Sequence, residues 1–225
     1  MDTKLFLSAI IKFLIGFVIV GLLIFIPAGT IKFFNGLLFM GLLFIPMFIG
    51  GIILFFLDPL LLKNRLNAKE KESEQKEVLF LSGVMFISGF IVSGLNYRYN
   101  WTNMPNFIVV IASVLFIISY ILYGEVLREN SFLLRTIEVK DDQKLVDTGL
   151  YGIVRHPMYA ITIVLFLMIP LILNSIISFV IFLVYPFIIV KRIKNEEKVL
   201  EKELKGYKEY KRKVKYRLVP FVWWF

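Results

Sequence analysis

The sequence predicts an all-α integral membrane protein with about six transmembrane helices and a cytosolic C-terminal amphipathic helix. Of its 225 residues, 58% are hydrophobic, including 23 Phe. The mean hydropathy is +0.77, and soluble domains have a less apolar composition. The apolar residues also form long uncharged blocks rather than stripes repeated every 3.6 residues. The excess apolar surface is therefore expected to face lipid in a multi-pass membrane protein.

The first four predicted crossings are single uncharged blocks. A helix needs about 20 mostly apolar residues to span a bilayer. The blocks that meet this requirement are Phe13–Ile31, Phe33–Leu57, Val78–Tyr97 and Tyr99–Gly124. We interpret the first block as a membrane helix rather than a signal peptide, because its apolar run is long.

The fifth uncharged block, Pro157–Val190, is too long for one crossing without a large tilt. Pro170 and the Asn174-Ser175 pair lie near its middle, and such residues are typical of helix breaks. We therefore expect a hairpin of two short helices, Met158–Leu173 and Ser175–Val190, which brings the number of membrane helices to six.

The distribution of Lys and Arg predicts which loops face the cytosol. These residues gather in Pro59–Glu77, in Glu125–His156 and in the tail from Lys191 onward, whereas the intervening loops hold one or none. Cytosolic loops are enriched in basic residues, so these segments and both termini are expected to be cytosolic. A prokaryotic chain of this kind would lie in the plasma (inner) membrane. Membrane lipids with anionic head groups then account for the net charge of +9, and no nucleic acid is expected.

The absence of Cys and the presence of a single His narrow the possible chemistry. A chain without Cys has no disulfides, no thiolate metal sites and no cysteine nucleophile. A single His excludes a multi-histidine metal site. No metal is therefore expected as a partner.

The first candidate site, Asp147–Tyr159, leads into the predicted hairpin. Its two glycines allow tight backbone geometry close to a ligand, and Pro157 suits the first position of a helix. A helix N-terminus carries partial positive charge and free N–H groups that hold a carboxylate, and Arg155 and His156 add donors. The same residues also fit a turn with an interfacial Arg and a helix-starting Pro.

Two further candidate sites follow the hairpin. Arg192 and Glu196 are four residues apart and share a helix face, although a surface ion pair is the simpler interpretation. The segment Leu200–Phe225 predicts an interfacial amphipathic helix, which either anchors the chain to lipid or helps to close a site. If the hairpin closes tightly, the first two candidates meet at the cytosolic membrane surface.

Four sequence patterns connect these segments. They are T-G-x-Y-x-x-V-R-H-P-x-Y at Thr148–Tyr159, R-x-x-x-E-E-x-x-L at Arg192–Leu200, G-Y-x-x-Y-x-x-x-V at Gly206–Val214, and a Leu-x-Pro ending at Leu218–Pro220. In order and spacing they resemble the isoprenylcysteine carboxyl methyltransferase family over roughly residues 125–222. The resemblance implies a methyltransferase-like catalytic region at 125–225, with the four spans of residues 1–124 as an accessory scaffold.

The resemblance implies S-adenosylmethionine as methyl donor, bound without a Rossmann domain. By position, the implied catalytic residues are Arg192 and Glu196. The implied cofactor-binding residues are Gln143, Lys144, Leu145, Val146, Tyr151, His156, Pro157, Met158, Tyr159 and Glu196. Two departures leave the acceptor open. Gln143 stands where the family often has His, and the helix between Glu197 and Tyr207 is one residue shorter.

The implied reaction is methyl transfer to a lipid-like or prenylcysteine-like acceptor, with its carboxylate as the favoured nucleophile. Arg192 would orient that carboxylate through its planar guanidinium, and Glu196 would accept hydrogen bonds from the cofactor. Three alternatives stay open: a phospholipid N-methyltransferase, an NADPH-dependent relative of the sterol-type reductases, and a membrane protein without enzymatic activity. The first needs a base that the sequence does not identify. The adjacent Glu196-Glu197 pair and the short chain favour methyl transfer over reduction.

Overall fold

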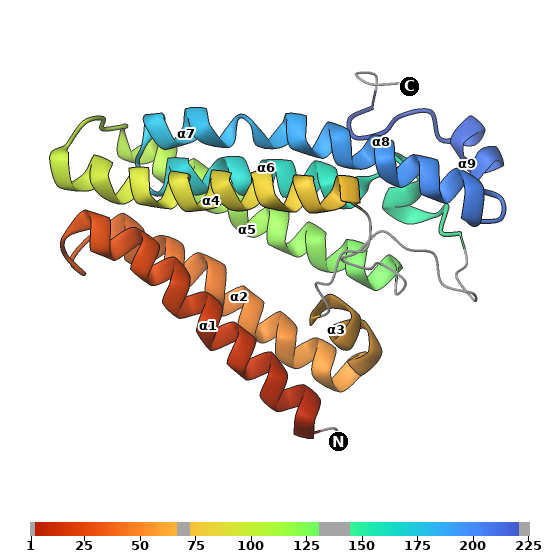
Figure 1. Ribbon diagram of the computed structural model, residues 1–225, viewed down its shortest axis with the longest axis horizontal. Coiled ribbons are helices and arrows are strands. Elements are labelled where there is room, and N and C mark those ends of the chain that lie inside the picture. The colour runs from red at the N-terminus through yellow and green to blue at the C-terminus, as the bar shows by residue number, and fades with distance from the viewer. Residues whose placement is uncertain (1–2, 67–72, 131–144, 221–225) are drawn as a thin grey trace.

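The computed structural model describes residues 3–66, 73–130 and 145–220, and this part of the chain contains helices and no strands (Figure 1). The predicted all-α fold is confirmed. The elements are α1 (Thr3–Ala28), α2 (Phe34–Leu57), α3 (Pro59–Leu66), α4 (Ser73–Tyr99), α5 (Asn106–Glu129), the 3₁₀ helix η1 (Gly149–Gly152), α6 (Pro157–Ile172), α7 (Ile176–Phe182), α8 (Tyr185–Glu203) and α9 (Tyr207–Lys213).

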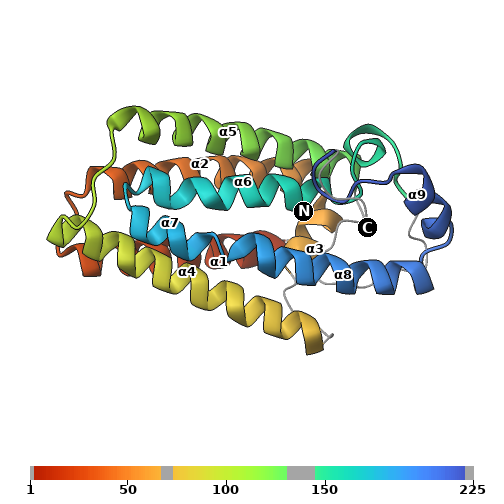
Figure 2. The same cartoon turned by 90° about the horizontal axis from the view of Figure 1, so that it is seen from above.

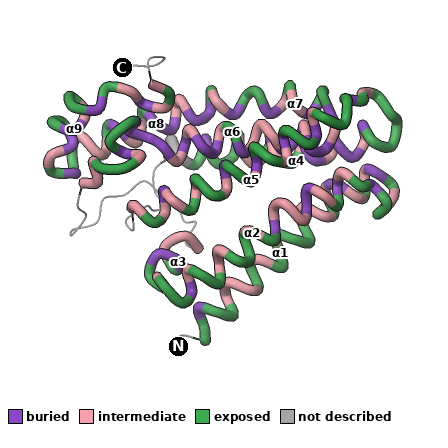
Figure 3. Tube along the Cα trace, turned by 180° about the vertical axis from the view of Figure 1, so that it is seen from behind, coloured by how far each residue is buried: buried purple, intermediate pink, exposed green. Residues whose placement is uncertain are grey.

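Five of the described helical segments are long and apolar enough to cross a membrane. They are α1, α2, α4, α5 and the combined α7–α8 segment, Ile176–Glu203. The remaining predicted crossing, Met158–Leu173, corresponds to α6, a shorter apolar helix of 16 residues. Exposed residues follow the outer faces of α1 and α2 (Figure 3), and many of them are Ile, Leu and Phe. Such faces suit contact with lipid chains.

The helices form a bundle crossed by an oblique pair. Figures 1 and 2 show α4, α5, α6 and α7–α8 side by side, while α1 and α2 approach the bundle near the turn that joins them and diverge towards α3. The close approach of α1 to α4 depends on Gly94, because a Cβ there would lie 2.4 Å from the Ile24 carbonyl oxygen. Gly89 similarly leaves room for the Phe182 ring, because a Cβ at position 89 would lie 2.3 Å from that ring. Small residues allow membrane helices to pack closely in this way.

The predicted hairpin is present, and its tip is fixed by side chains. Asn174 adopts a left-handed backbone conformation (φ 57°), and the Ser175 hydroxyl caps α7 by accepting a hydrogen bond from Ser178 N. Asn174 Oδ1 accepts from Met104 N at 2.7 Å, and Asn96 Nδ2 donates to Asn174 O at 3.0 Å. With the tip held against the α4–α5 loop, the start of α6 and the middle of α8 lie together towards the opposite end of the bundle.

Several helix boundaries differ from the predicted blocks. The first helix begins at Thr3 rather than Phe13, and it contains Lys12, whose Nζ donates to Leu66 O at 2.7 Å. The fourth crossing begins at Asn106 rather than Tyr99, because Asn96 Oδ1 accepts hydrogen bonds from Thr102 N and Oγ1 and stabilises a loop there.

The second arm of the hairpin extends beyond the predicted end at Val190. It breaks at Leu183-Val184 and continues as α8 to Glu203. Pro186 follows this break, and its missing N–H cannot sustain the helical ladder of α7. Figure 1 nevertheless shows α7 and α8 running in line.

The C-terminal amphipathic segment forms two helical pieces within the described residues. Gly206 has a φ of 86° and separates the end of α8 from α9, and the backbone from Val214 to Pro220 is not helical. The expected apolar face is present, since one cluster buries Leu204, Tyr207, Tyr210 and Val214. Residues 221–225 lie outside the described chain.

Candidate functional site

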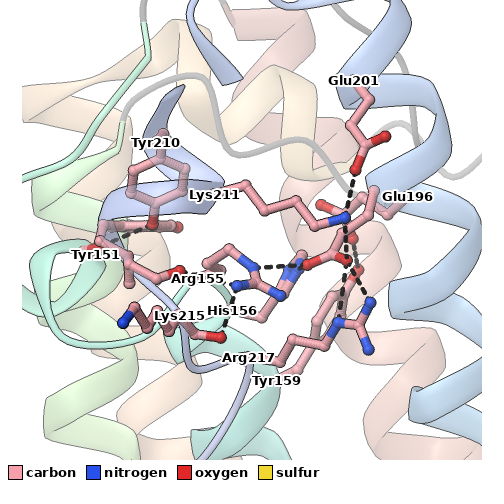
Figure 4. A network of polar contacts seen from close by, with 12 residues as sticks. Tyr151, Arg155, His156, Tyr159, Glu196, Glu201, Tyr210, Lys211, Lys215 and Arg217 are labelled. Atoms are coloured by element: carbon pink, nitrogen blue, oxygen red, sulfur yellow. Dashed lines mark hydrogen bonds and ion pairs between the residues drawn. The ribbon is translucent and has the colours of Figure 1, made fainter. Parts of the chain in front are cut away.

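The candidate residues gather where the start of α6, the middle of α8 and the C-terminal segment meet (Figure 4). Tyr159, in the first turn of α6, connects the two predicted catalytic residues. Its hydroxyl donates to Glu196 Oε2 at 2.6 Å and accepts from Arg192 Nε at 2.8 Å. The Arg192 guanidinium also lies 5.8 Å from the Tyr159 ring centroid. Arg192 is only 9% exposed, so a surface ion pair does not describe this arrangement.

A second carboxylate, Glu197, is the centre of a buried ionic cluster. Its Oε1 accepts from Arg155 Nε at 2.8 Å and lies 3.2 Å from His156 Nε2, while its Oε2 accepts from Arg217 Nη2 at 2.8 Å. Glu197 is 3% exposed. A buried carboxylate is expensive unless it is paired and hydrogen-bonded, and here two guanidinium groups satisfy it. The cluster therefore ties α8 to the start of α6 and to the C-terminal segment.

The C-terminal segment also pairs with the residues before α6 through its backbone. Arg155 N donates to Tyr216 O and His156 N donates to Arg217 O, both at 2.9 Å. Arg155 Nη1 donates to the carbonyl oxygens of Val214 and Lys215 at 2.8 Å. The segment thus lies against the candidate site, as the site-closing alternative requires.

His156 and Pro157 begin α6 as the sequence predicts, with Pro157 in the first turn. The His156 ring, however, faces Glu197 and not Glu196. His156 O accepts hydrogen bonds from both Tyr159 N and Ala160 N. The helix N-terminus therefore offers fewer free N–H groups to a carboxylate than we expected from sequence.

Gly149 allows a close contact within the chain. Its φ is 55°, and a Cβ would lie 1.8 Å from Glu129 Oε1. The Glu129 carboxylate instead accepts from Leu150 N, at 3.0 Å from Oε2. The close approach fixes the end of α5 against η1 and thereby positions Tyr151.

Tyr151, Val146 and Met158, all predicted to contact the cofactor, share one apolar cluster with Tyr123 of α5. Burial raises the pKa of Tyr151 to about 12, so its phenol is neutral at physiological pH. Its carbonyl oxygen accepts from Tyr210 OH at 2.7 Å, and burial likewise raises the Tyr210 pKa above its ordinary value.

The remaining predicted cofactor residues precede η1. Leu145 packs against the cluster of Leu204, Tyr207 and Tyr210. Gln143 and Lys144 lie outside the described residues.

Two buried donors near Glu197 have no hydrogen-bond partner within the described residues. They are Arg155 Nη2 and Tyr207 OH. Burial raises the Tyr207 pKa, and the charges of Glu197 and Glu196 raise it further. Buried polar atoms are rarely left unsatisfied, so these two donors mark a place that suits a polar group from a ligand or a water molecule.

Sequence reasoning missed Glu197 as the structural centre, although a signal for it was present. Ile189, Ile193 and Glu197 are spaced by four residues, and all three are buried. Residues at this spacing share one helix face, so the periodicity of α8 placed Glu197 on the apolar side. Nothing in the local pattern identified Arg217 as its partner.

The sequence patterns within the candidate site correspond to a known family. Residues 114–202 match the isoprenylcysteine carboxyl methyltransferase (ICMT) family. This part of the chain is therefore similar to that family. The methyltransferase region so defined runs from the middle of α5 almost to the end of α8 and contains Tyr159, Arg192 and Glu196. It excludes Tyr207, which lies in the Gly206–Val214 pattern, and Arg217, whose place in the site comes from the structure. The chain matches no curated protein.

The match is typical of a membrane methyltransferase, in agreement with the apolar helices of the fold. Within residues 3–66, 73–130 and 145–220, no three His, Asp or Glu side chains are grouped so as to hold a metal ion.

Proposed function

We propose that the protein transfers a methyl group from S-adenosylmethionine to the carboxylate of a lipid-like or prenylcysteine-like acceptor at the cytosolic membrane face. The observation that carries this proposal is the Tyr159 hydroxyl, which joins Arg192 to Glu196 at the mouth of the α6–α8 hairpin. This contact places a buried cation and a carboxylate within one side-chain network, inside the segment that matches the methyltransferase family.

The residues present fit the cofactor. S-adenosylmethionine carries an ammonium group and ribose hydroxyls as donors and a carboxylate as acceptor. Glu196 Oε2 accepts a hydrogen bond from the Tyr159 hydroxyl, and Glu196 Oε1 accepts no hydrogen bond from the described residues. Arg155 Nη2 and Tyr207 OH are buried donors with no described partner. Glu196 would hold the cofactor's donors, and Arg155 with Tyr207 would hold its carboxylate.

When bound, S-adenosylmethionine supplies an electrophilic methyl group on a sulfonium. The chain's own residues position the reactants and exclude water. Arg192 presents a planar guanidinium to the acceptor carboxylate, and its hydrogen bond to Tyr159 orients that guanidinium. A carboxylate nucleophile is already ionised at neutral pH, so no side chain has to act as general base.

The basic end of α8 and α9 supports the cytosolic placement. Lys194, Lys198 and Lys202 are exposed on α8 beside the site, and basic residues mark the cytosolic side of membrane proteins. The apolar helices around the site suit an acceptor that reaches it from the lipid phase.

Calorimetry of S-adenosylmethionine binding to the purified protein in nanodiscs tests the proposal. We expect saturable binding to the wild type and at least about tenfold weaker binding to Glu196→Gln, since a hydrogen bond to a charged group is lost. Glu203→Gln is the matched control, because it neutralises an exposed carboxylate on the same helix and should bind like the wild type. Equal binding by Glu196→Gln and Glu203→Gln would contradict the assigned site.

The alternative functions give different results in the same preparation. NADPH binding without S-adenosylmethionine binding would favour the reductase. Binding of neither would favour a protein without enzymatic activity. With a radiolabelled methyl donor and a lipid extract, label that alkali releases identifies a methyl ester, whereas alkali-stable label identifies an N-methyl product.

A further inference from the structure

The N-terminal half of the chain contributes α3, a short helix outside the segment that matches the methyltransferase family. Its first turn is capped by Asp58, whose Oδ1 accepts from Leu61 N at 2.9 Å. Its last residue, Leu66, accepts from Lys12 Nζ of α1 through its carbonyl oxygen. Leu62 packs into a cluster with Leu5 and Phe55. Both ends of α3 and one face are thus fixed by the N-terminal helices.

This fixed helix directs Arg65 onto the methyltransferase region. Arg65 Nη2 donates to the hydroxyl of Tyr123 on α5, and its guanidinium lies 5.5 Å from the centroid of the Tyr123 ring. A guanidinium in this position is attracted to the ring face as well as to the hydroxyl. Arg65 therefore restrains both the position and the orientation of the Tyr123 side chain.

Tyr123 in turn packs against residues predicted to contact the cofactor. It belongs to the apolar cluster that contains Val146, Tyr151 and Met158. The positive charge of Arg65 also lowers the pKa of the Tyr151 phenol, whereas the negative charge of Glu196 raises it. Through Tyr123, Arg65 thus contacts the cluster that contains these predicted cofactor residues.

We propose that Arg65 is a positioning residue for cofactor binding, acting through Tyr123, and that the N-terminal helices complete the site in this way. The inference rests on the proposed function, because it concerns the same cofactor site. Neither Arg192 nor Glu196 is bonded to Arg65 among the described residues, so the effect of Arg65 reaches the cofactor by holding Tyr123 against Tyr151 and Met158.

A double-mutant cycle on S-adenosylmethionine affinity tests the inference. We expect Arg65→Ala and Tyr123→Phe each to raise the dissociation constant about threefold to tenfold, which is less than the direct loss of a charge-assisted hydrogen bond to the ligand because Arg65 acts through Tyr123. Both changes break the same contact. The dissociation constant of the double variant should therefore not exceed that of the single variant with the higher dissociation constant. Arg65→Lys should recover part of the affinity, since it keeps the charge but not the planar guanidinium.

Lys63→Ala is the matched control, because Lys63 is an exposed basic residue on the same helix. It should bind with wild-type affinity. Unfolding midpoints separate a positioning role from a structural one. An Arg65→Ala protein that unfolds earlier yet binds with unchanged affinity would overturn the inference and leave the proposed function intact, as would additive effects in the cycle. Failure of the wild type to bind would overturn both.

Discussion

Glu196 and Glu197 are adjacent in α8, but their carboxylates contact separate networks. Glu196 accepts from Tyr159, which is bound in turn to Arg192. Glu197 is enclosed by Arg155, His156 and Arg217. Adjacent residues on a helix point in directions about 100° apart, so the pair faces two sides of the hairpin. We infer that one carboxylate serves ligand binding and the other serves structure.

Glu197→Gln should therefore impair stability more than Glu196→Gln does. Removing one partner of a buried ion pair leaves uncompensated charge and typically costs about 3 to 5 kcal/mol, and here Arg155 and Arg217 both lose their carboxylate. The free energy of unfolding, measured by denaturant titration in detergent micelles, should fall by roughly 3 kcal/mol for Glu197→Gln and change little for Glu196→Gln. Equal losses in the two variants would refute the division of roles.

The proposed cytosolic position of the site gives a second prediction. The chain contains no Cys, so a single introduced cysteine reports one position without a cysteine-free background having to be made. Lys208→Cys on α9 and Thr30→Cys at the α1–α2 turn lie at opposite ends of the bundle (Figures 1 and 2).

In intact cells or right-side-out vesicles, a membrane-impermeant maleimide should label Thr30→Cys and spare Lys208→Cys until the membrane is permeabilised. The reverse pattern would contradict the orientation predicted from Lys and Arg. Labelling of both positions before permeabilisation would contradict the predicted spans.

The sequence predicted the hairpin and the Arg192–Glu196 face because both depend on local information. Pro170 and Asn174 mark a break in an uncharged block, and a spacing of four residues defines a helix face. The uncharged block at Phe13–Ile31 marked only part of α1, because the helix also includes Lys12, whose long side chain reaches the end of α3.

The sequence did not predict which residues far apart in the chain contact each other. Arg217 lies 20 residues from Glu197, and Arg65 lies 58 residues from Tyr123. Neither separation corresponds to a helical or strand period, and both pairs form only when separate elements pack. The periodicity of α8 identified a buried position for Glu197, but its compensation by two guanidinium groups required the fold.

The ion pair between Asp147 and Lys213 predicts a small effect of acid on stability. Lys213 Nζ donates to Asp147 Oδ2 at 2.9 Å, and this hydrogen bond, together with the lysine charge, lowers the pKa of Asp147 below its ordinary value. A lowered folded-state pKa means that the pair stabilises the protein above the ordinary Asp pKa and that this contribution is lost as the pH falls through the folded-state pKa.

Asp147→Asn should therefore lower the unfolding midpoint slightly at pH 7, because an exposed pair contributes little, and should match the wild type in strong acid. A difference between the two proteins that persists or grows in acid would contradict the assignment. Because the pair is exposed, added salt should reduce the difference at pH 7.

Gly149→Ala should disrupt the segment between α5 and α6 through two separable effects. A Cβ would lie 1.8 Å from Glu129 Oε1, and the φ of 55° is unfavourable for any residue with a side chain. We expect a loss of stability of about 2 kcal/mol or more and weaker cofactor binding through displacement of Tyr151. Gly124→Ala is the matched control, because a Cβ there meets no neighbour within 4 Å and Ala is the better helix former.

Glu129→Ala combined with Gly149→Ala separates the two effects. Removing the Glu129 carboxylate relieves the collision but leaves the strained φ and also removes the acceptor for Leu150 N. The double variant should therefore recover only part of the unfolding midpoint lost in Gly149→Ala. Full recovery would show that backbone conformation at residue 149 has no cost. No recovery would show that the approach of Glu129 is not what requires glycine at this position.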